Sequence, residues 1–156
     1  MQKKGSLTVQ ETQQKMEHYC AYQERCHQEV EKKLKSLGVI QIAQEEIIGH
    51  LIQNNYLNET RFAKSFARGK FRAKKWGKNR ILRELKMRNI SEYNIKKGLE
   101  EIPEEEYLAT FYILFEKRKQ AVDHLAVHQQ KKKILDYLLY RGWDKPLIYD
   151  AIRENF

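Results

Sequence analysis

Two cysteines and two histidines near the start of the sequence are the residues best suited to holding a metal ion. They are His18, Cys20, Cys26 and His27, and thiolate and imidazole are ligands that zinc prefers. The pairs straddle a predicted helix and the turn after it, and their spacing matches no common zinc module. Cys20 is better explained as a reduced core residue. We therefore expect no metal and no cofactor.

Residue patterns that would support catalysis are also weak. His124 and His128 are four residues apart, but no glutamate follows His124 as a zinc protease motif requires. Gly69 and Gly77 lie in or after a helix, with no preceding strand to form a phosphate-binding loop. No serine stands with a histidine and an acid in a nucleophile elbow. The sequence favours a protein that is not an enzyme.

The strongest chemical signal is a block of positive charge between Arg61 and Arg88. It contains twelve basic residues and one acidic residue, Glu84, whereas the other residues hold 18 basic and 20 acidic side chains. The whole excess of the chain, +9, therefore comes from this block. Charge of one sign suits phosphates or acidic side chains, while a surface that serves only solubility mixes signs. The block predicts a docking surface.

Helical periodicity sorts these cations onto faces. At about 100° per residue, one face of this helix holds five cations: Arg61, Lys64, Arg68, Arg72 and Lys75. This face lies apart from an apolar stripe of Phe62, Phe66, Gly69 and Ala73. Phe71 falls off that stripe, and packing against a neighbouring helical unit is favoured over stacking on a base. The predicted contact residues are Arg61, Lys64, Arg68, Phe71, Arg72, Lys75, Lys78, Arg80, Arg83 and Lys86.

The elements that must position these residues are all helical. Helices are expected at about 8–24, 27–36, 42–54, 58–75, 79–88, 91–102, 104–121 and 127–141, and from 144 onward. Thr8 with Glu11 forms a capping box, and Asn58, Ser91 and Asp144 open helices. No apolar run approaches the roughly 18 residues of a membrane span. Residues 1–10 lack the apolar region of a secretion signal, and two cysteines make no disulfide framework, so we expect a cytoplasmic protein.

An internal repeat underlies this pattern. Val30, Leu34, Gly38 and Val39 align with Ile81, Leu85, Asn89 and Ile90, and then with Ile134, Leu138, Gly142 and Trp143. Each copy has an apolar pair four residues apart, a Gly or Asn that ends the helix in the left-handed conformation, and a large apolar residue. We expect an all-α, elongated and curved array of three three-helix units, at 1–57, 58–103 and 104–156.

Residues 54–90 resemble the core signature of the RecX family, the bacterial regulators of the RecA recombinase. The similar segments are Asn55-Tyr56-Leu57, Arg61-Phe62-Ala63, the turn Lys75-Trp76-Gly77, Arg80-Ile81-Leu82-Arg83-Glu84-Leu85 and Arg88-Asn89-Ile90. Leu138 to Gly142-Trp143 is similar to a later family segment. Asn55 and Asn89 stand where the family usually has Gly, and Asn58 where it has Asp. Asn serves both left-handed and N-cap positions, so the backbone roles survive.

The resemblance implies a function. Proteins of this family bind the RecA–single-stranded DNA filament and mainly inhibit its ATPase, strand exchange and co-protease activities in DNA repair and the SOS response. The implied partners are the recombinase filament and single-stranded DNA, directly or through the filament, and the chain itself is expected to be a monomer. Two alternatives remain open: a stand-alone helical DNA-binding module or transcriptional regulator, and an adaptor that binds an acidic protein.

Overall fold

The computed structural model describes residues 7–156, and within them every regular element is a helix. The helices are α1 (Val9–Tyr22), α2 (His27–Ser36), α3 (Gln41–Gln53), α4 (Glu59–Lys74), α5 (Lys78–Met87), α6 (Glu92–Leu99), α7 (Glu104–Ala121), α8 (Val127–Tyr140) and α9 (Lys145–Asn155). Each predicted helix is present, and most ends agree within two residues. The expectations for residues 1–6 lie outside the described part of the chain.

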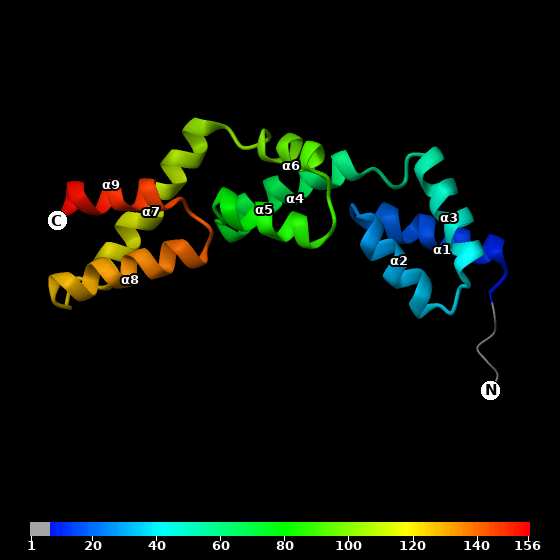
Figure 1. Ribbon diagram of the computed structural model, residues 1–156, viewed down its shortest axis with the longest axis horizontal. Coiled ribbons are helices and arrows are strands. Elements are labelled where there is room, and N and C mark those ends of the chain that lie inside the picture. Colours follow the sequence, from blue (N-terminus) through cyan, green and yellow to red (C-terminus); the bar gives the residue numbers. More distant parts are fainter. Residues whose placement is uncertain (1–6) are drawn as a thin grey trace.

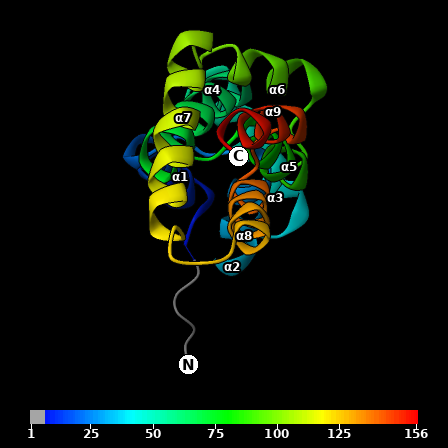
Figure 2. The ribbon, with the colours of Figure 1, turned by 90° about the vertical axis from the view of Figure 1, so that its left-hand side faces the viewer.

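The helices form an elongated array with α1 and α9 at opposite ends (Figure 1). Three groups follow one another along the long axis: α1–α3, α4–α6 and α7–α9. Viewed end-on, α7 and α8 run down the C-terminal group and are joined at one edge by the turn after Ala121 (Figure 2). The predicted all-α array is confirmed. Unit boundaries at residues 57 and 103 remain a proposal.

Local signals in the sequence set the helix ends. The Thr8 amide donates to Glu11 Oε1 (2.9 Å) and the Glu11 amide to Thr8 Oγ1 (3.0 Å), which completes the predicted capping box. Asn58 accepts from the Arg61 amide at 2.9 Å. The left-handed residues after helices include Gly38, Asn89 and Gly142, with φ of 77°, 60° and 95°. The backbone logic of the repeat is therefore confirmed.

One left-handed residue is a surprise. The helix is interrupted at Trp76-Gly77, between the end of α4 and the start of α5, but the left-handed residue of this turn is Lys75, with φ 59°, whereas Gly77 has φ −78°. A left-handed conformation costs a residue with a Cβ about 1–2 kcal/mol. Gly77 is required for another reason: a Cβ there would strike the backbone of Gly142 and Trp143. The glycine permits close contact rather than an unusual dihedral angle.

That contact locks the α4–α5 turn onto the α8–α9 turn. The Gly77 amide donates to the Arg141 carbonyl (2.8 Å) and the Asn79 amide to the Gly142 carbonyl (3.0 Å). Trp143 Nε1 donates to the Lys75 carbonyl at 3.1 Å. Its indole is fully buried and stacks on Tyr107, with ring centroids 4.5 Å apart. We call this set of contacts the turn lock.

Two apolar cores support the array. The first, inside α1–α3, includes Met16, Leu34 and Ile47. The second runs without interruption from α4 to α9 and also takes in Cys26, from the turn before α2. The second and third groups therefore share a core, whereas the first joins them mainly at its edge.

The predicted apolar stripe of α4 was partly wrong. Gly69 and Ala73 are exposed, and the buried residues of this helix are Phe62, Ala63, Ala67 and Phe71. The reason is that α4 packs most closely on α6, where Gly98 lies so near Ala63 that a Cβ on Gly98 would reach 2.7 Å from the Ala63 carbonyl oxygen. Small residues, not the large aromatics, face the closest neighbour.

The turn lock predicts an asymmetry between glycines. Gly77→Ala should lower the free energy of unfolding by about 2 kcal/mol, because the new methyl group overlaps the Gly142 backbone. Gly69→Ala, in an exposed part of α4 with nothing within 4 Å, should raise it by about 1 kcal/mol through helix propensity. Chemical denaturation of both variants measures the difference. Equal effects of the two substitutions would contradict the lock.

Candidate docking surface

Much of the predicted basic face of α4 is neutralised within the chain. Lys64 and Arg68 both pair with Glu101, at 4.0 and 2.7 Å. Arg72 Nε lies 3.4 Å from Glu106, and Lys78 Nζ lies 3.5 Å from Glu104. These carboxylates come from the α6–α7 connection and the first turn of α7.

Arg61 has a structural partner as well. Its Nε donates to Glu24 at 2.6 Å and its Nη2 to the Asn55 carbonyl at 2.9 Å. The neighbouring Glu59 accepts from the His27 amide at 2.9 Å. Arg61 therefore ties the α1–α2 turn to the start of α4, so its charge is largely engaged in holding the first group against the second.

Phe71 has to be removed from the predicted contact residues. Its side chain is only 2 % exposed, and its ring packs against Tyr107 of α7 with centroids 6.0 Å apart. The expectation that it contacts a neighbouring unit is confirmed, whereas a burial this deep leaves no surface for a partner. Phe71 lay outside the predicted apolar stripe because the buried face of α4 is wider than that stripe.

The remaining cations of the block are available. Within residues 7–156, no carboxylate lies within ion-pair distance of the following side chains: Lys70, Lys74, Lys75, Arg80, Arg83 and Lys86. Four of the six were predicted contact residues, while Lys70 and Lys74 were not. Positive potential is therefore concentrated near the α4–α5 turn and the outer side of α5.

Two of these cations, Lys70 and Arg80, alternate with aromatic rings across the second and third groups. Arg88, which pairs with Glu84 at 3.0 Å, lies against one of the same rings. Arg88 and Lys70 lie 4.8 and 5.4 Å from the Phe66 ring centre. Lys70 and Arg80 lie 5.1 and 4.3 Å from Trp76. Arg80 also lies 4.8 Å from the ring of Tyr140, which is 73 % exposed. We call this set the cation–aromatic ladder: Phe66, Lys70, Trp76, Arg80, Arg88 and Tyr140.

The turn lock positions this ladder. Trp76 sits between Lys75 and Gly77, both of which bond to the α8–α9 turn. Arg80 Nη1 donates to the Tyr140 carbonyl at 3.3 Å, so it joins α5 to the end of α8. Rings held beside guanidinium and ammonium groups can stack on planar groups while the cations meet phosphates or carboxylates. The ladder thus offers both modes of contact on one surface.

Sequence reasoning found only part of the ladder. Trp76 was expected in the turn of the family signature and Arg80 among the contact residues. The other four residues were not proposed for binding: Phe66, Lys70, Arg88 and Tyr140. The spacing of Phe66 and Lys70, four residues apart on a helix, could have indicated their pairing. Tyr140 lies 60 residues from Arg80, and no local sequence pattern predicts a contact between them.

The metal-ligand candidates do not come together. No cluster of three or more His, Cys, Asp or Glu side chains that could hold a metal is found in residues 7–156. Cys20 and Cys26 are free and buried, and burial raises the pKa of the Cys20 thiol to about 11. Both thiols therefore behave as core groups.

No described helix is long and apolar enough to cross a membrane.

Comparison with known proteins gives consistent relatives. Residues 58–99, which span α4 to α6, match the family model described as the second three-helix domain of RecX. The regulatory protein RecX of Bacillus cytotoxicus is 29 % identical over 136 residues, covering 87 % of this chain and 50 % of that protein. That of Bacillus cereus strain B4264 is 27 % identical with the same coverage. The chain spans about half the length of these curated relatives.

Solved structures share the architecture. The crystal structure of RecX from Lactobacillus salivarius superimposes with a TM-score of 0.81 and 25 % identity, covering 94 % of this chain and 95 % of that one. A second crystal structure, of a regulatory protein RecX, gives a TM-score of 0.83 at 20 % identity, covering 94 % and 73 %. At that lower identity the second likeness shows the fold alone.

The neutralisation of cations on α4 can be tested by removing the carboxylate that pairs with two of them. Glu101→Gln should increase retention on a heparin column, because Lys64 and Arg68 lose their shared carboxylate. Stability should fall by no more than about 1 kcal/mol, since these pairs are partly exposed. Glu116→Gln removes the same charge from an exposed site that forms no ion pair within residues 7–156, and it is the matched control. Equal retention of the two variants would show that the pairs do not mask the face.

Proposed function

This chain belongs to the RecX family, and we propose that it regulates the RecA recombinase by binding the RecA–single-stranded DNA filament. In this proposal it mainly inhibits the ATPase, strand exchange and co-protease activities of the filament, and so acts in DNA repair and the SOS response. It works by binding, without catalysis of its own, in the cytoplasm where the filament forms.

The observation that carries the proposal is the cation–aromatic ladder. It joins residues from α4, α5 and α8 on one surface of an elongated array. A filament presents repeated protein surfaces and a phosphate backbone, which an extended ligand can contact at several points. Arginine and lysine beside aromatic rings are suited to acidic side chains, phosphates and exposed bases.

The way such contact would inhibit follows from differential binding. A ligand shifts a conformational equilibrium only by as much as it prefers one state. A rigid array that contacts neighbouring protomers binds most tightly at one distance between those protomers. It therefore stabilises the filament conformation with that distance over the other conformations that ATP turnover requires. The continuous core from α4 to α9 supplies the necessary rigidity.

The rival function, a stand-alone duplex-binding module, finds less support. Helix-turn-helix proteins place the N-terminal residues of their recognition helix against the bases. Here the backbone at the start of α5 is bonded to other groups: the Lys78 amide donates to the Tyr107 hydroxyl at 2.9 Å, and the Asn79 amide donates to the Gly142 carbonyl. The first turn of the helix that best resembles a recognition helix is therefore held against α7 and the α8–α9 turn, which restricts its approach to a DNA groove.

Two charge-matched double variants test the proposal. Lys70→Ala with Arg80→Ala removes two cations of the ladder, whereas Arg68→Ala with Arg72→Ala removes two cations that are already paired. In a recombinase ATPase assay on single-stranded DNA, we expect about tenfold more of the ladder variant to be needed for half-inhibition. A charged contact at an exposed surface contributes up to about 1 kcal/mol, and the variant loses two of them. The paired variant should inhibit nearly as well as the natural chain.

Circular dichroism and thermal unfolding of both variants ensure that each is folded at the assay temperature. Unchanged inhibition by the ladder variant, or a loss confined to the Arg68 and Arg72 variant, would reject the ladder as the docking surface. Absence of any effect of the natural chain on the recombinase would reject the proposed function itself.

A further inference from the structure

One aromatic ring on α8 is shared by two arginines from different parts of the third group. The Arg118 guanidinium, near the end of α7, lies 4.8 Å from the centre of the Tyr137 ring. The Arg141 guanidinium, directly after α8, lies 4.9 Å from the same centre. All three side chains are half-buried. Two positive charges are thus held close together on one ring, and we call these three residues the two-arginine site.

Neither arginine is neutralised by the part of the chain that the structure describes. No carboxylate of residues 7–156 lies within ion-pair distance of Arg118 or Arg141. Arg141 Nη1 donates to the Lys74 carbonyl at 2.9 Å, whereas Arg118 Nε is buried and has no hydrogen-bond partner among these residues. Like charges repel, and a guanidinium that is partly cut off from water binds an anion more strongly than a fully hydrated one. The site therefore favours an anion at its outer nitrogens.

Two lysines add to the positive charge around the site. Lys117 precedes Arg118, and Lys133 lies four residues before Tyr137, on the same side of α8. Both lysines are exposed, and neither forms an ion pair within residues 7–156.

The acidic residues nearest in sequence do not offset this charge. Glu116 is two residues from Arg118, so it points toward the opposite side of α7. Asp136 precedes Tyr137, but its carboxylate pairs with Lys132 at 2.9 Å. The side of α7 and α8 that carries the two arginines therefore keeps an excess of positive charge.

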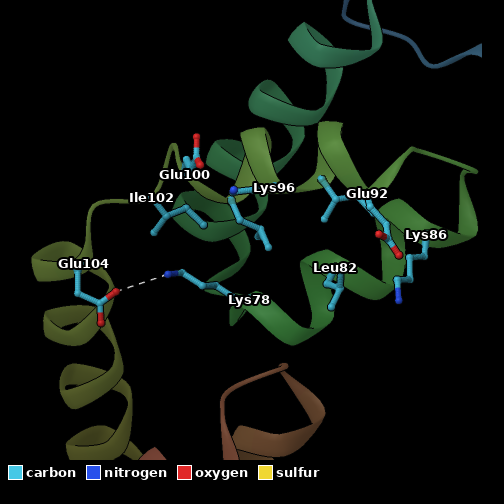
Figure 3. Close-up of a pocket in the computed structure, with 10 residues that line it drawn as sticks. Lys78, Leu82, Lys86, Glu92, Lys96, Glu100, Ile102 and Glu104 are labelled. Atoms are coloured by element: carbon cyan, nitrogen blue, oxygen red, sulfur yellow. Dashed lines mark hydrogen bonds and ion pairs between the residues drawn. The ribbon is translucent and has the colours of Figure 1, made fainter.

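The groove between α5 and α6 has a different character. It measures about 540 Å³ and is lined by charges of both signs: Lys78, Lys86, Lys96, Glu92, Glu100 and Glu104. Lys78 and Glu104 form an ion pair at one end of it, at 3.5 Å (Figure 3). Opposite charges compensate one another in this groove, whereas the two-arginine site has only cations. The excess of positive charge is thus a local property of the site and not of every hollow in this basic protein.

An exposed ring beside the site indicates which kind of anion fits. Tyr140 lies three residues after Tyr137, one turn further along α8, and it is mostly exposed. Guanidinium groups bind phosphates through paired hydrogen bonds, and exposed aromatic rings stack on bases of any sequence. A phosphate that is joined to a base uses both features, whereas the carboxylate of an acidic protein leaves the ring unused. A base can stack in this way only when it is unpaired.

We propose that Arg118, Tyr137 and Arg141 bind a phosphate group of single-stranded nucleic acid, with a neighbouring base stacked on Tyr140. The site adjoins the cation–aromatic ladder, because Tyr140 belongs to the ladder and Arg80 donates to its carbonyl. One strand can therefore follow both surfaces, from the α4–α5 turn along α8. The contact needs no recombinase, so it does not rest on the function proposed above.

Fluorescence anisotropy of the full chain with a labelled oligothymidine of about 12 nucleotides tests the site in the absence of recombinase. Arg118→Gln and Arg141→Gln should each weaken binding about fivefold, as expected for one exposed charged contact. Each should also reduce the slope of log affinity against log salt by about 0.7, because one phosphate contact is lost. Lys96→Gln removes an unpaired charge from the α6 wall of the groove in Figure 3 and is the matched control, with no effect expected.

A third variant and a competitor complete the test. Arg118→Lys keeps the charge of a half-buried side chain but loses the planar group, so it should bind less tightly with an unchanged slope; circular dichroism shows which variants are folded. Natural affinity in every folded arginine variant overturns the proposal, and so does an equal loss in Lys96→Gln. Displacement of the oligonucleotide by a polyglutamate peptide of equal charge, as readily as by unlabelled oligothymidine, would overturn it in favour of an acidic protein.

Discussion

The contact between the backbones of Gly77 and Gly142 is the constraint on which the working part of the molecule depends. Neither position tolerates a Cβ: at Gly77 it would overlap the backbone of Gly142 and Trp143, and at Gly142 it would overlap Arg80 at the start of α5. Hydrogen bonds from Gly77 and Asn79 to the α8–α9 turn fix the direction in which α5 leaves that contact. The buried indole of Trp143 then closes the junction with a side-chain bond to Lys75. The second and third groups thus behave as one continuous body.

The ladder is a consequence of that junction. Arg80 can reach both Trp76 and Tyr140 only because the lock brings the end of α8 beside the start of α5. The same fold decides which cations remain available. The α6–α7 connection carries Glu101 and Glu106 alongside α4, where they neutralise cations that a linear count treats as exposed. Charge at a surface is therefore a property of the tertiary structure as much as of the segment.

The fold was largely predictable because its signals are local. The capping box at Thr8 and the left-handed Gly38, Asn89 and Gly142 follow from side-chain and backbone preferences within a few residues. The errors arose at residues whose conformation or burial depends on elements that are distant in the sequence. Lys75 occupies a left-handed position because the turn must present its carbonyl to Trp143, and Phe71 is buried by α7, more than 30 residues further on. Helical periodicity likewise does not predict the contacts of Arg68 with Glu101 and of Arg80 with Tyr140.

The central claim is that the surface held by the turn lock is the one that meets the filament, and the two tryptophans allow a direct test. Trp76 is partly exposed in the ladder and Trp143 is fully buried in the lock. The chain can be labelled with 7-azatryptophan, whose emission is separable from that of ordinary tryptophan, and quenched with acrylamide with and without the recombinase–single-stranded DNA filament. A Trp76→Phe variant supplies the signal of Trp143 alone. The account predicts that the filament strongly protects Trp76 and leaves Trp143 unchanged. Equal quenching of Trp76 with and without a saturating amount of filament would contradict it.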